Sequence, residues 1–454
     1  MDREYRSHTE LFEQTPVPKA VMTMAVPTIV AQLIILIYNM ADTFFIGRTN
    51  DPYMVAGASL ILPIFNVCIA VANIAGVGGG TLVARLLGRH EGEEAKRVAS
   101  FSLRFSLLGG LLFAGLTALF MGPLLRLLGA SDETFAFARQ YALCVIVVGA
   151  APTVLSMTMG NLLRNIGCAK QAGFGVSMGG VINIALDPLF MFVLLPRGRE
   201  ILGAGIATAL SNFIVCGYFL AVIARLKSPV LTLSPRVGLP GRRQLASFFA
   251  VGLPAAAGPF FFDLDYIVID RLMASYSDMA LAAVGIVLKV ERLPLNAGIG
   301  LCLGMVPLAA YNYSSGDLRR MDEVLRFTRR TGVAIALVSI ALYELFASEL
   351  IRVFLNDAET VGYGAQFLRI RAPATVVMFL CFIYVHFFQA VGHGGKALLL
   401  VIVRWALVNI PMLFLLNALL GVNGVVWAQL VSDSLVAFGS ALFYRRFRKR
   451  TVPA

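Results

Sequence analysis

The chain has 454 residues, of which 58% are hydrophobic and only 14% are charged, with a mean hydropathy of +0.79 and a formal net charge of +12. Soluble domains carry about 25% charged residues, so this composition excludes an ordinary water-soluble protein and points to a bilayer as the solvent. Because most basic residues fall in short links between apolar runs, the positive charge indicates membrane topology and argues against nucleic acid as a partner.

A helix that crosses a membrane needs about 20 predominantly apolar residues, and the chain contains about twelve such runs. In chain order they lie near 20–46, 53–82, 98–122, 136–160, 171–195, 202–225, 245–270, 280–309, 328–348, 364–390, 397–419 and 422–444. The pattern predicts an all-α membrane protein with twelve transmembrane helices.

Two octets at the ends of apolar runs resemble each other. Ala41–Arg48 reads ADTFFIGR, and Leu264–Arg271, about 223 residues later, reads LDYIVIDR. A proline opens each of the two runs, Pro27 in the first and Pro254 in the second. A long internal repeat in an apolar chain is typical of a transporter built from two related halves. We therefore expect two pseudo-symmetric six-helix bundles, arranged as parallel repeats.

The expected domains are an N-terminal lobe over 1–225, a cytoplasmic linker over 226–244, and a C-terminal lobe over 245–454 that ends in a basic tail. Lysine and arginine concentrate in alternate links and in that tail, so the positive-inside rule predicts that both termini are cytoplasmic. The chain shows no nucleotide-binding loop, catalytic triad or paired cysteine spacing. We expect no enzyme activity and no cofactor beyond a coupling ion.

Polar groups at membrane depth in the first half are the candidates for chemistry. Asn183 and Asp187 are four residues apart and share one helical face, and Asp42 lies on the first helix. The full set is Gln32, Tyr38, Asp42, Asn161, Asn183, Asp187 and Thr208. Their oxygens could bind Na⁺, or a buried carboxylate could accept a proton. The alternative is that both aspartates only terminate helices.

The second half carries a different set of charges. Asp265 lies on the 245–270 run, and Lys289, Glu291 and Arg292 lie on the 280–309 run. These four residues form a possible charge cluster, either mutually neutralised and structural or active in gating or substrate binding. No acid corresponds to Asp187 in the second half.

Pro27 and His386 complete the candidates. Pro27 removes a backbone hydrogen bond inside the first helix, which makes it a candidate hinge. His386 occupies the position that matches Asn161, as a packing residue or a proton relay.

Several of these segments resemble the MATE (multidrug and toxic compound extrusion) transporters, especially the bacterial branch. The resemblance lies in Pro27, Gln32 and the octet of the first helix, and in the segments Asn161–Gly167, Asn183–Pro188 and Gly203–Thr208. It implies efflux of drug-like, often cationic amphiphiles in exchange for H⁺ or Na⁺, by a multi-pass protein of the bacterial cytoplasmic membrane. It assigns the cation site to Asp42, Asn183, Asp187 and Thr208, with Gln32, Tyr38 and Asn161 nearby. We expect a monomer.

Two other functions stay open at this point. A lipid-linked oligosaccharide flippase of the same superfamily would need a large cationic cavity, for which only Lys289 and Arg292 argue. An intramembrane enzyme or receptor would not need the duplication.

Overall fold

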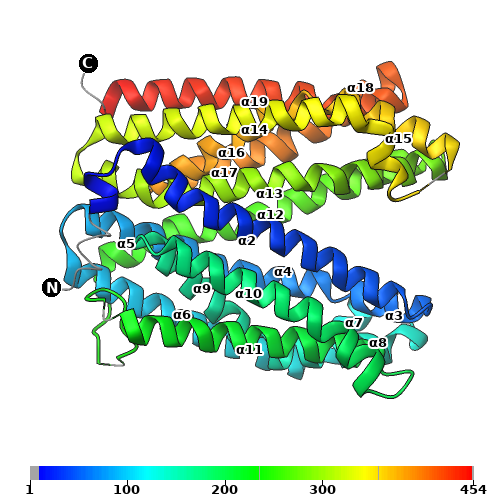
Figure 1. The fold of residues 1–454 in the computed structure, drawn as a ribbon, viewed down its shortest axis with the longest axis horizontal. Coiled ribbons are helices and arrows are strands. Elements are labelled where there is room, and N and C mark those ends of the chain that lie inside the picture. Colours follow the sequence, from blue (N-terminus) through cyan, green and yellow to red (C-terminus); the bar gives the residue numbers. More distant parts are fainter. Residues whose placement is uncertain (1–9, 227, 235, 356, 452–454) are drawn as a thin grey trace. The chain divides into compact units, whose positions relative to one another are not determined.

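The computed structural model describes residues 10–226, 228–234, 236–355 and 357–451, and every regular element in these ranges is helical (Figure 1). The N-terminal tail before residue 10 and linker positions 227 and 235 lie outside the described residues. Within these described ranges, ten helices are long and apolar enough to cross a membrane, and two bent helix pairs bring the number up to 12 if each pair is one span. The predicted all-helical architecture is confirmed.

The chain divides into two compact units. The first comprises Met1–Gln14 and Val30–Ala256, and the second comprises Thr15–Ile29 and Ala257–Ala454. Two helices belong to both units: α2 (Val17–Gly47) passes from the second to the first after Ile29, and α12 (Arg242–Ala274) passes back after Ala256.

The first unit contains twelve further helical segments in the described part of the chain. They are α3 (Pro52–Ser59), α4 (Leu62–Asn73), η1 (Ile74–Gly78), α5 (Gly79–Gly88), α6 (Gly92–Leu119), α7 (Met121–Leu127), α8 (Asp132–Ala142), η2 (Leu143–Val148), α9 (Ala150–Asn165), α10 (Ala169–Pro188), η3 (Leu189–Leu194) and α11 (Glu200–Leu226). The η segments are π-helical turns, which are rare and frequently lie at functional sites.

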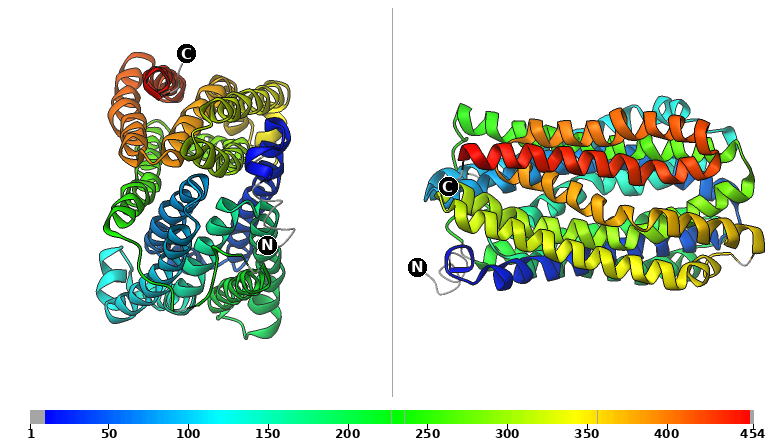
Figure 2. Two further views of the ribbon diagram at one scale, coloured as in Figure 1. Left: turned by 90° about the vertical axis from the view of Figure 1, so that its left-hand side faces the viewer. Right: turned by 90° about the horizontal axis from the view of Figure 1, so that it is seen from above.

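The second unit is built around α13 (Asp278–Ser315). Within an apolar 18-residue stretch of this helix, 72% of the residues are buried. Its neighbours are α14 (Leu318–Arg352), α15 (Ala358–Arg371), α16 (Ala374–Ala390), α17 (Gly394–Ile402), η4 (Val403–Asn409), α18 (Ile410–Leu420) and α19 (Val422–Thr451). Within this unit α13, α14, α16 and α19 run alongside one another, as the views of Figures 1 and 2 show.

The two halves of the sequence repeat have helix bends and positive-φ glycines at matching places. In the first unit the chain bends by 48° between Val148 and Ala150, and in the second it bends by 52° between Arg371 and Ala374. The helix that follows each bend ends at a glycine with positive φ, Gly167 (97°) and Gly392 (85°). A left-handed residue after a helix is the position that favours glycine. The two halves therefore share a backbone plan.

The linker and the start of α12 pack on the first unit. Val230 and Leu231 are buried in its core, and Phe248 stacks edge-on against Phe101 and Phe105. Arg104 also donates to the backbone oxygen of Val237. These contacts explain why the start of α12, up to Ala256, groups with the first unit.

Candidate functional site

Three of the predicted cation ligands meet in the first unit. Asn183, on α10, lies between Asp187, one turn further along the same helix, and Thr208 on α11. The Asn183 Nδ2 donates to Asp187 Oδ1 at 3.5 Å and to Thr208 Oγ1 at 3.4 Å. Asn183 and Asp187 are buried, with Asp187 at 0% exposure. The four-residue spacing therefore placed the amide and the carboxylate on one face, as predicted.

Asp42 is the second carboxylate of this cluster. It lies on the half-buried face of α2 and is close enough to Asp187 for the two charges to interact. One oxygen of each carboxyl group, Asp42 Oδ1 and Asp187 Oδ2, is buried without a hydrogen-bond partner among the described residues. A proton or a cation at this position would satisfy these two unpartnered acceptors and reduce the repulsion between the two carboxylates.

Tyr141 belongs to the same cluster and was missed by the sequence reasoning. This α8 residue is 8% exposed, and its side chain reaches both Asp42 and Thr208. Its hydroxyl adds a fifth polar group to the four predicted ones. The only signal in the sequence was a tyrosine near the start of the fourth apolar run, which is too common a feature to select it.

The local backbone explains how these helices approach one another. A Cβ added to Gly180 of α10 would lie 2.7 Å from Ile34 Cγ2 and 3.2 Å from Tyr38 Cδ1, so the glycine allows α2 to pack closely on α10. Pro188 follows Asp187 directly, and the π-helical turn η3 begins at the next residue. The missing N–H of proline interrupts the regular hydrogen bonding beside the buried acid.

The residues predicted near the cation site have different outcomes. Tyr38 lies at the site: it precedes Asp42 by one turn on α2, and its hydroxyl is close enough to feel the charges of Asp42 and Asp187. Gln32 is half-buried on α2, three turns before Asp42. Asn161 faces another part of the unit: its Nδ2 donates to Met157 O at 3.0 Å, and its Oδ1 accepts from Arg164 Nη1 at 2.9 Å.

The charge cluster predicted in the second unit is rearranged in the structure. Lys289 and Arg292 are exposed, and the Arg292 guanidinium lies over the Tyr266 ring at 5.8 Å. Glu291 instead pairs with Arg371 through two hydrogen bonds of 2.8 Å each. The Arg371 side chain is only 6% exposed.

Asp265, the fourth predicted member, lies in a separate buried group. It is 0% exposed, and its Oδ1 accepts from Asn409 Nδ2 at 2.6 Å. Nearby, Arg404 and Asp433 form a bidentate ion pair of 2.7 and 2.8 Å. The sequence reasoning missed Arg404 and Asp433, although an arginine and an acid inside apolar runs were the signal that could have found them.

His386 is half-buried, and its Nδ1 lies 2.8 Å from the backbone oxygen of Phe382 one turn earlier. Its ring packs against the Phe382 ring.

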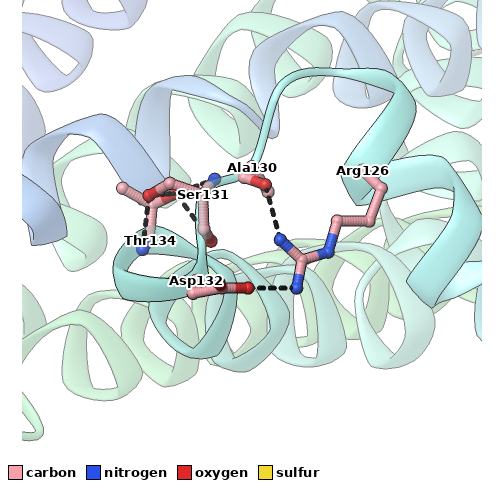
Figure 3. Close-up of polar contacts among 5 residues, drawn as sticks. All are labelled: Arg126, Ala130, Ser131, Asp132 and Thr134. Carbon is pink, nitrogen blue, oxygen red and sulfur yellow. Dashed lines mark hydrogen bonds and ion pairs between the residues drawn. The ribbon is translucent and has the colours of Figure 1, made fainter.

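A cavity of about 350 Å³ lies apart from all these acids. Its lining is mostly apolar and includes Leu60, Pro63, Leu128 and Ser131. The adjacent turn is held by Arg126, which donates to Ala130 O and to Asp132, and by reciprocal hydrogen bonds between Ser131 and Thr134 (Figure 3). None of the candidate acids lines this cavity.

Comparisons with known proteins agree with this architecture. A family model described as MatE matches residues 27–189 and 254–415, which are the two repeats. The chain is 32% identical to the multidrug export protein MepA of Staphylococcus saprophyticus and 30% identical to that of Staphylococcus aureus strain MSSA476, each over 97% of this chain and 96% of the relative. A solved structure described as an outward-facing multidrug resistance MATE family transporter has a TM-score of 0.92 at 23% identity, covering 97% of this chain and 98% of the other. The chain belongs to the MatE family, as its motifs indicated.

Proposed function

We propose that this chain exports drug-like, often cationic amphiphilic compounds across the bacterial cytoplasmic membrane in exchange for H⁺ or Na⁺, with both termini cytoplasmic. Relatives named as multidrug export proteins, which match nearly the whole chain, support the export of drugs. The observation that carries the exchange mechanism is the pair of unpartnered carboxylate oxygens of Asp42 and Asp187. A secondary transporter needs such a group, whose ion occupancy can bias two conformations.

The donor set fits either coupling ion. Carboxylate, hydroxyl and amide oxygens are the ligands that small hard cations prefer, and Asp42, Asp187, Thr208 and Asn183 supply all three kinds. A proton would serve as well, because it would neutralise one of two neighbouring negative charges. In both cases the ion removes charge repulsion beside α2, and the conformation that binds drug becomes less favourable.

The available driving force is sufficient for accumulation. One charge that crosses about 100 mV releases about 2.3 kcal/mol, which corresponds to roughly fifty-fold accumulation. A proton gradient adds about 1.4 kcal/mol per pH unit. No nucleotide hydrolysis is required for drug export at this scale.

The test is ethidium transport into proteoliposomes under separately imposed pH and Na⁺ gradients. We expect one gradient to drive uptake by the native chain, and Asp42→Asn and Asp187→Asn each to reduce the initial rate more than about tenfold, the effect of about 1.4 kcal/mol. Asp132→Asn is the matched control in the same unit, because this carboxyl is exposed and pairs only with Arg126. Transport at the native rate by folded Asp187→Asn protein contradicts the proposed coupling role.

A further inference from the structure

Among the described residues of the second unit, Asp265 and four other mostly buried charged side chains form one group. They come from five elements: Asp265 on α12, Glu291 on α13, Arg371 on α15, Arg404 on η4 and Asp433 on α19. Four of them are at most 5% exposed, and the Glu291 side chain is 17% exposed. With all five ionised, three negative charges oppose two positive ones. One carboxylate is therefore in excess.

Both arginines are already matched by acids other than Asp265. Arg371 binds Glu291 through Nε and Nη2, and Arg404 binds Asp433 through the same two nitrogens. Gln429 completes the second pair by donating to Asp433 Oδ2 at 2.8 Å. Bidentate pairs of this kind are the strongest arrangement of a guanidinium and a carboxylate. Each pair is closed, so Asp265 is the excess acid.

Asp265 and Asn409 leave complementary atoms unsatisfied. Asn409 Nδ2 donates to Asp265 Oδ1, while Asp265 Oδ2 and Asn409 Oδ1 are both buried without a hydrogen-bond partner among the described residues. Both unsatisfied atoms are acceptors, so the ionised carboxylate cannot satisfy the amide oxygen. A protonated Asp265 carries an O–H donor, and a carboxylic acid and a primary amide can form two reciprocal hydrogen bonds. One proton therefore removes both defects and the excess charge.

The neighbouring charges influence whether Asp265 is ionised or protonated. The hydrogen bond from Asn409 and the charges of Arg371 and Arg404 favour the ionised form of Asp265, whereas the charge of Asp433 disfavours it. The attraction is reduced because each arginine is neutralised by its own acid at 2.8 Å or less. The loss of hydration in a fully buried carboxylate disfavours its ionised form. The two unsatisfied acceptors favour the protonated form as well.

Asp265 also matches Asp42 in the octet repeat of the sequence. The two aspartates occupy the same place in octets about 223 residues apart, and Pro188 and Pro411 have the same separation. The residue before proline is Asp187 in the first half and Ile410 in the second, where Asn409 takes over the contact with the acid. The second unit thus keeps one acid and one amide of this arrangement.

We infer that Asp265 is a second proton-binding site, in which a proton on Asp265 Oδ2 is shared with Asn409 Oδ1. This inference goes beyond the proposed function, because it concerns proton uptake in the second unit whether or not drug is bound. A purely structural role for Asp265, ionised and held by Arg371 and Arg404, is the alternative.

The test is infrared difference spectroscopy of the purified full chain during a pH change, in H₂O and D₂O. A protonated carboxylic acid gives a carbonyl stretch that shifts in D₂O. We expect Asp265→Asn to remove one such band, and Glu323→Gln, which alters an exposed carboxyl in the same unit, to change none of the buried-acid bands. Persistence of every band in folded Asp265→Asn protein overturns the inference.

A second variant keeps the test decisive if Asp265→Asn does not fold. Asn409→Leu removes the amide acceptor but leaves the acid, so we expect the Asp265 band to move in frequency while the bands lost in Asp42→Asn stay in place. An unmoved band shows that the proton is not shared with Asn409. The infrared bands report protonation of Asp265 and not drug transport. The inference about Asp265 can therefore fail while drug transport remains proton-driven, and it can hold if drug transport is Na⁺-driven.

Discussion

The Thr208 hydroxyl is one of the neutral oxygens that we propose to bind the coupling ion in the first unit. It accepts from Asn183 Nδ2 at 3.4 Å and lies beside Tyr141. Thr208→Val keeps the side-chain shape but removes this oxygen, so we expect the apparent affinity for the coupling ion to fall about tenfold, since a hydrogen bond to a charged site contributes about 1.5 kcal/mol. The measurement is the ion concentration that half-saturates ethidium transport in proteoliposomes.

Thr153→Val is the matched control for that variant. Thr153 is buried in the first unit, and its Oγ1 donates at 2.7 Å to the backbone oxygen of Gly149, the residue that precedes its own helix. We expect an unchanged ion requirement for this protein. Equal shifts in both variants mean that the effect comes from helix packing and not from the site.

Asp357 caps the N-terminus of α15 and makes the stability of its first turn depend on pH. The Thr360 backbone N–H and then its hydroxyl, at 2.8 and 2.9 Å, hold the pKa of Asp357 below its ordinary value. A lowered pKa means that the cap stabilises α15 fully above the ordinary carboxyl pKa and loses this contribution as the pH falls through the lowered value. We expect hydrogen exchange in the first turn of α15, corrected for intrinsic rates, to accelerate at acid pH. Asp357→Asn caps the helix without titrating, so persistence of the same acid response in that variant contradicts the assignment.

The site residues differ in how visible they were in the sequence. Asp42 and Asp187 stood out because a carboxylate inside an apolar run needs a reason. Arg371 was not among the candidates, because a basic residue near the end of an apolar run cannot be told from a loop charge until its partner Glu291, 80 residues away, is located. Tyr141 could not be selected from the sequence, because tyrosines are common in membrane helices. Pairwise contacts between distant runs require the fold.

At the scale of elements, α13 holds the first part of α2 through a pair of glycines. A Cβ added to Gly300 would lie 2.6 Å from Ile29 Cα, and one added to Gly304 would lie 2.5 Å from Ala25 Cα. The neighbouring atoms are backbone, so they cannot move aside by changing a rotamer. The four-residue spacing is the arrangement that lets membrane helices approach closely.

Gly300→Ala and Gly304→Ala are therefore expected to destabilise the protein by about 1–3 kcal/mol each, the usual cost of overpacking. The measurement is the free energy of unfolding, or the Tm, of the purified protein in detergent. Gly285→Ala is the control on the same helix, because no heavy atom lies within 4 Å of the added Cβ. We expect it to leave stability unchanged or to raise it by up to about 1 kcal/mol. Equal Tm values for all three variants rule out this packing role.

The helices were predictable from the sequence, but their π-helical turns were not. Long apolar runs predict the number and type of spans. The bounds of α2, and of α10 together with η3 (Ala169–Leu194), agree closely with the predicted 20–46 and 171–195. By contrast, η3 follows Asp187-Pro188 and η4 ends at Asn409. One extra residue in a helical turn leaves apolar composition unchanged, so hydropathy carries no trace of it.

At the scale of the whole chain, the two repeats have kept one backbone plan and diverged in charge. Both contain a bent helix pair, a glycine with positive φ and a proline near a buried acid or amide. The first repeat concentrates two acids, whereas the second surrounds one acid with two closed ion pairs. The sequence predicted the duplication, but the buried ion pairs appear only when helices far apart in the chain are brought together.

Pro27 lies where α2 passes from one unit to the other. The helix is continuous over Val17–Gly47, yet the residues up to Ile29 belong to the second unit and those from Val30 to the first. Proline removes a backbone hydrogen bond two residues before this division, which is a suitable place for α2 to bend when the site changes occupancy. Pro27→Ala restores the missing N–H, so we expect a helix of equal or greater thermal stability that bends less readily.

The expected consequence of Pro27→Ala is slower transport, about tenfold if the restored hydrogen bond adds about 1.4 kcal/mol to the conformational barrier. Initial rates of ethidium uptake measure this, and Tm values for the same preparations show that the fold is intact. Pro307→Ala is the control, because Pro307 interrupts α13, which lies entirely within the second unit. If both variants slow transport equally, proline has only a general effect on helix packing. If Pro27→Ala alone is slow while ion binding is unchanged, the bend in α2 couples the occupied site to the movement that releases drug.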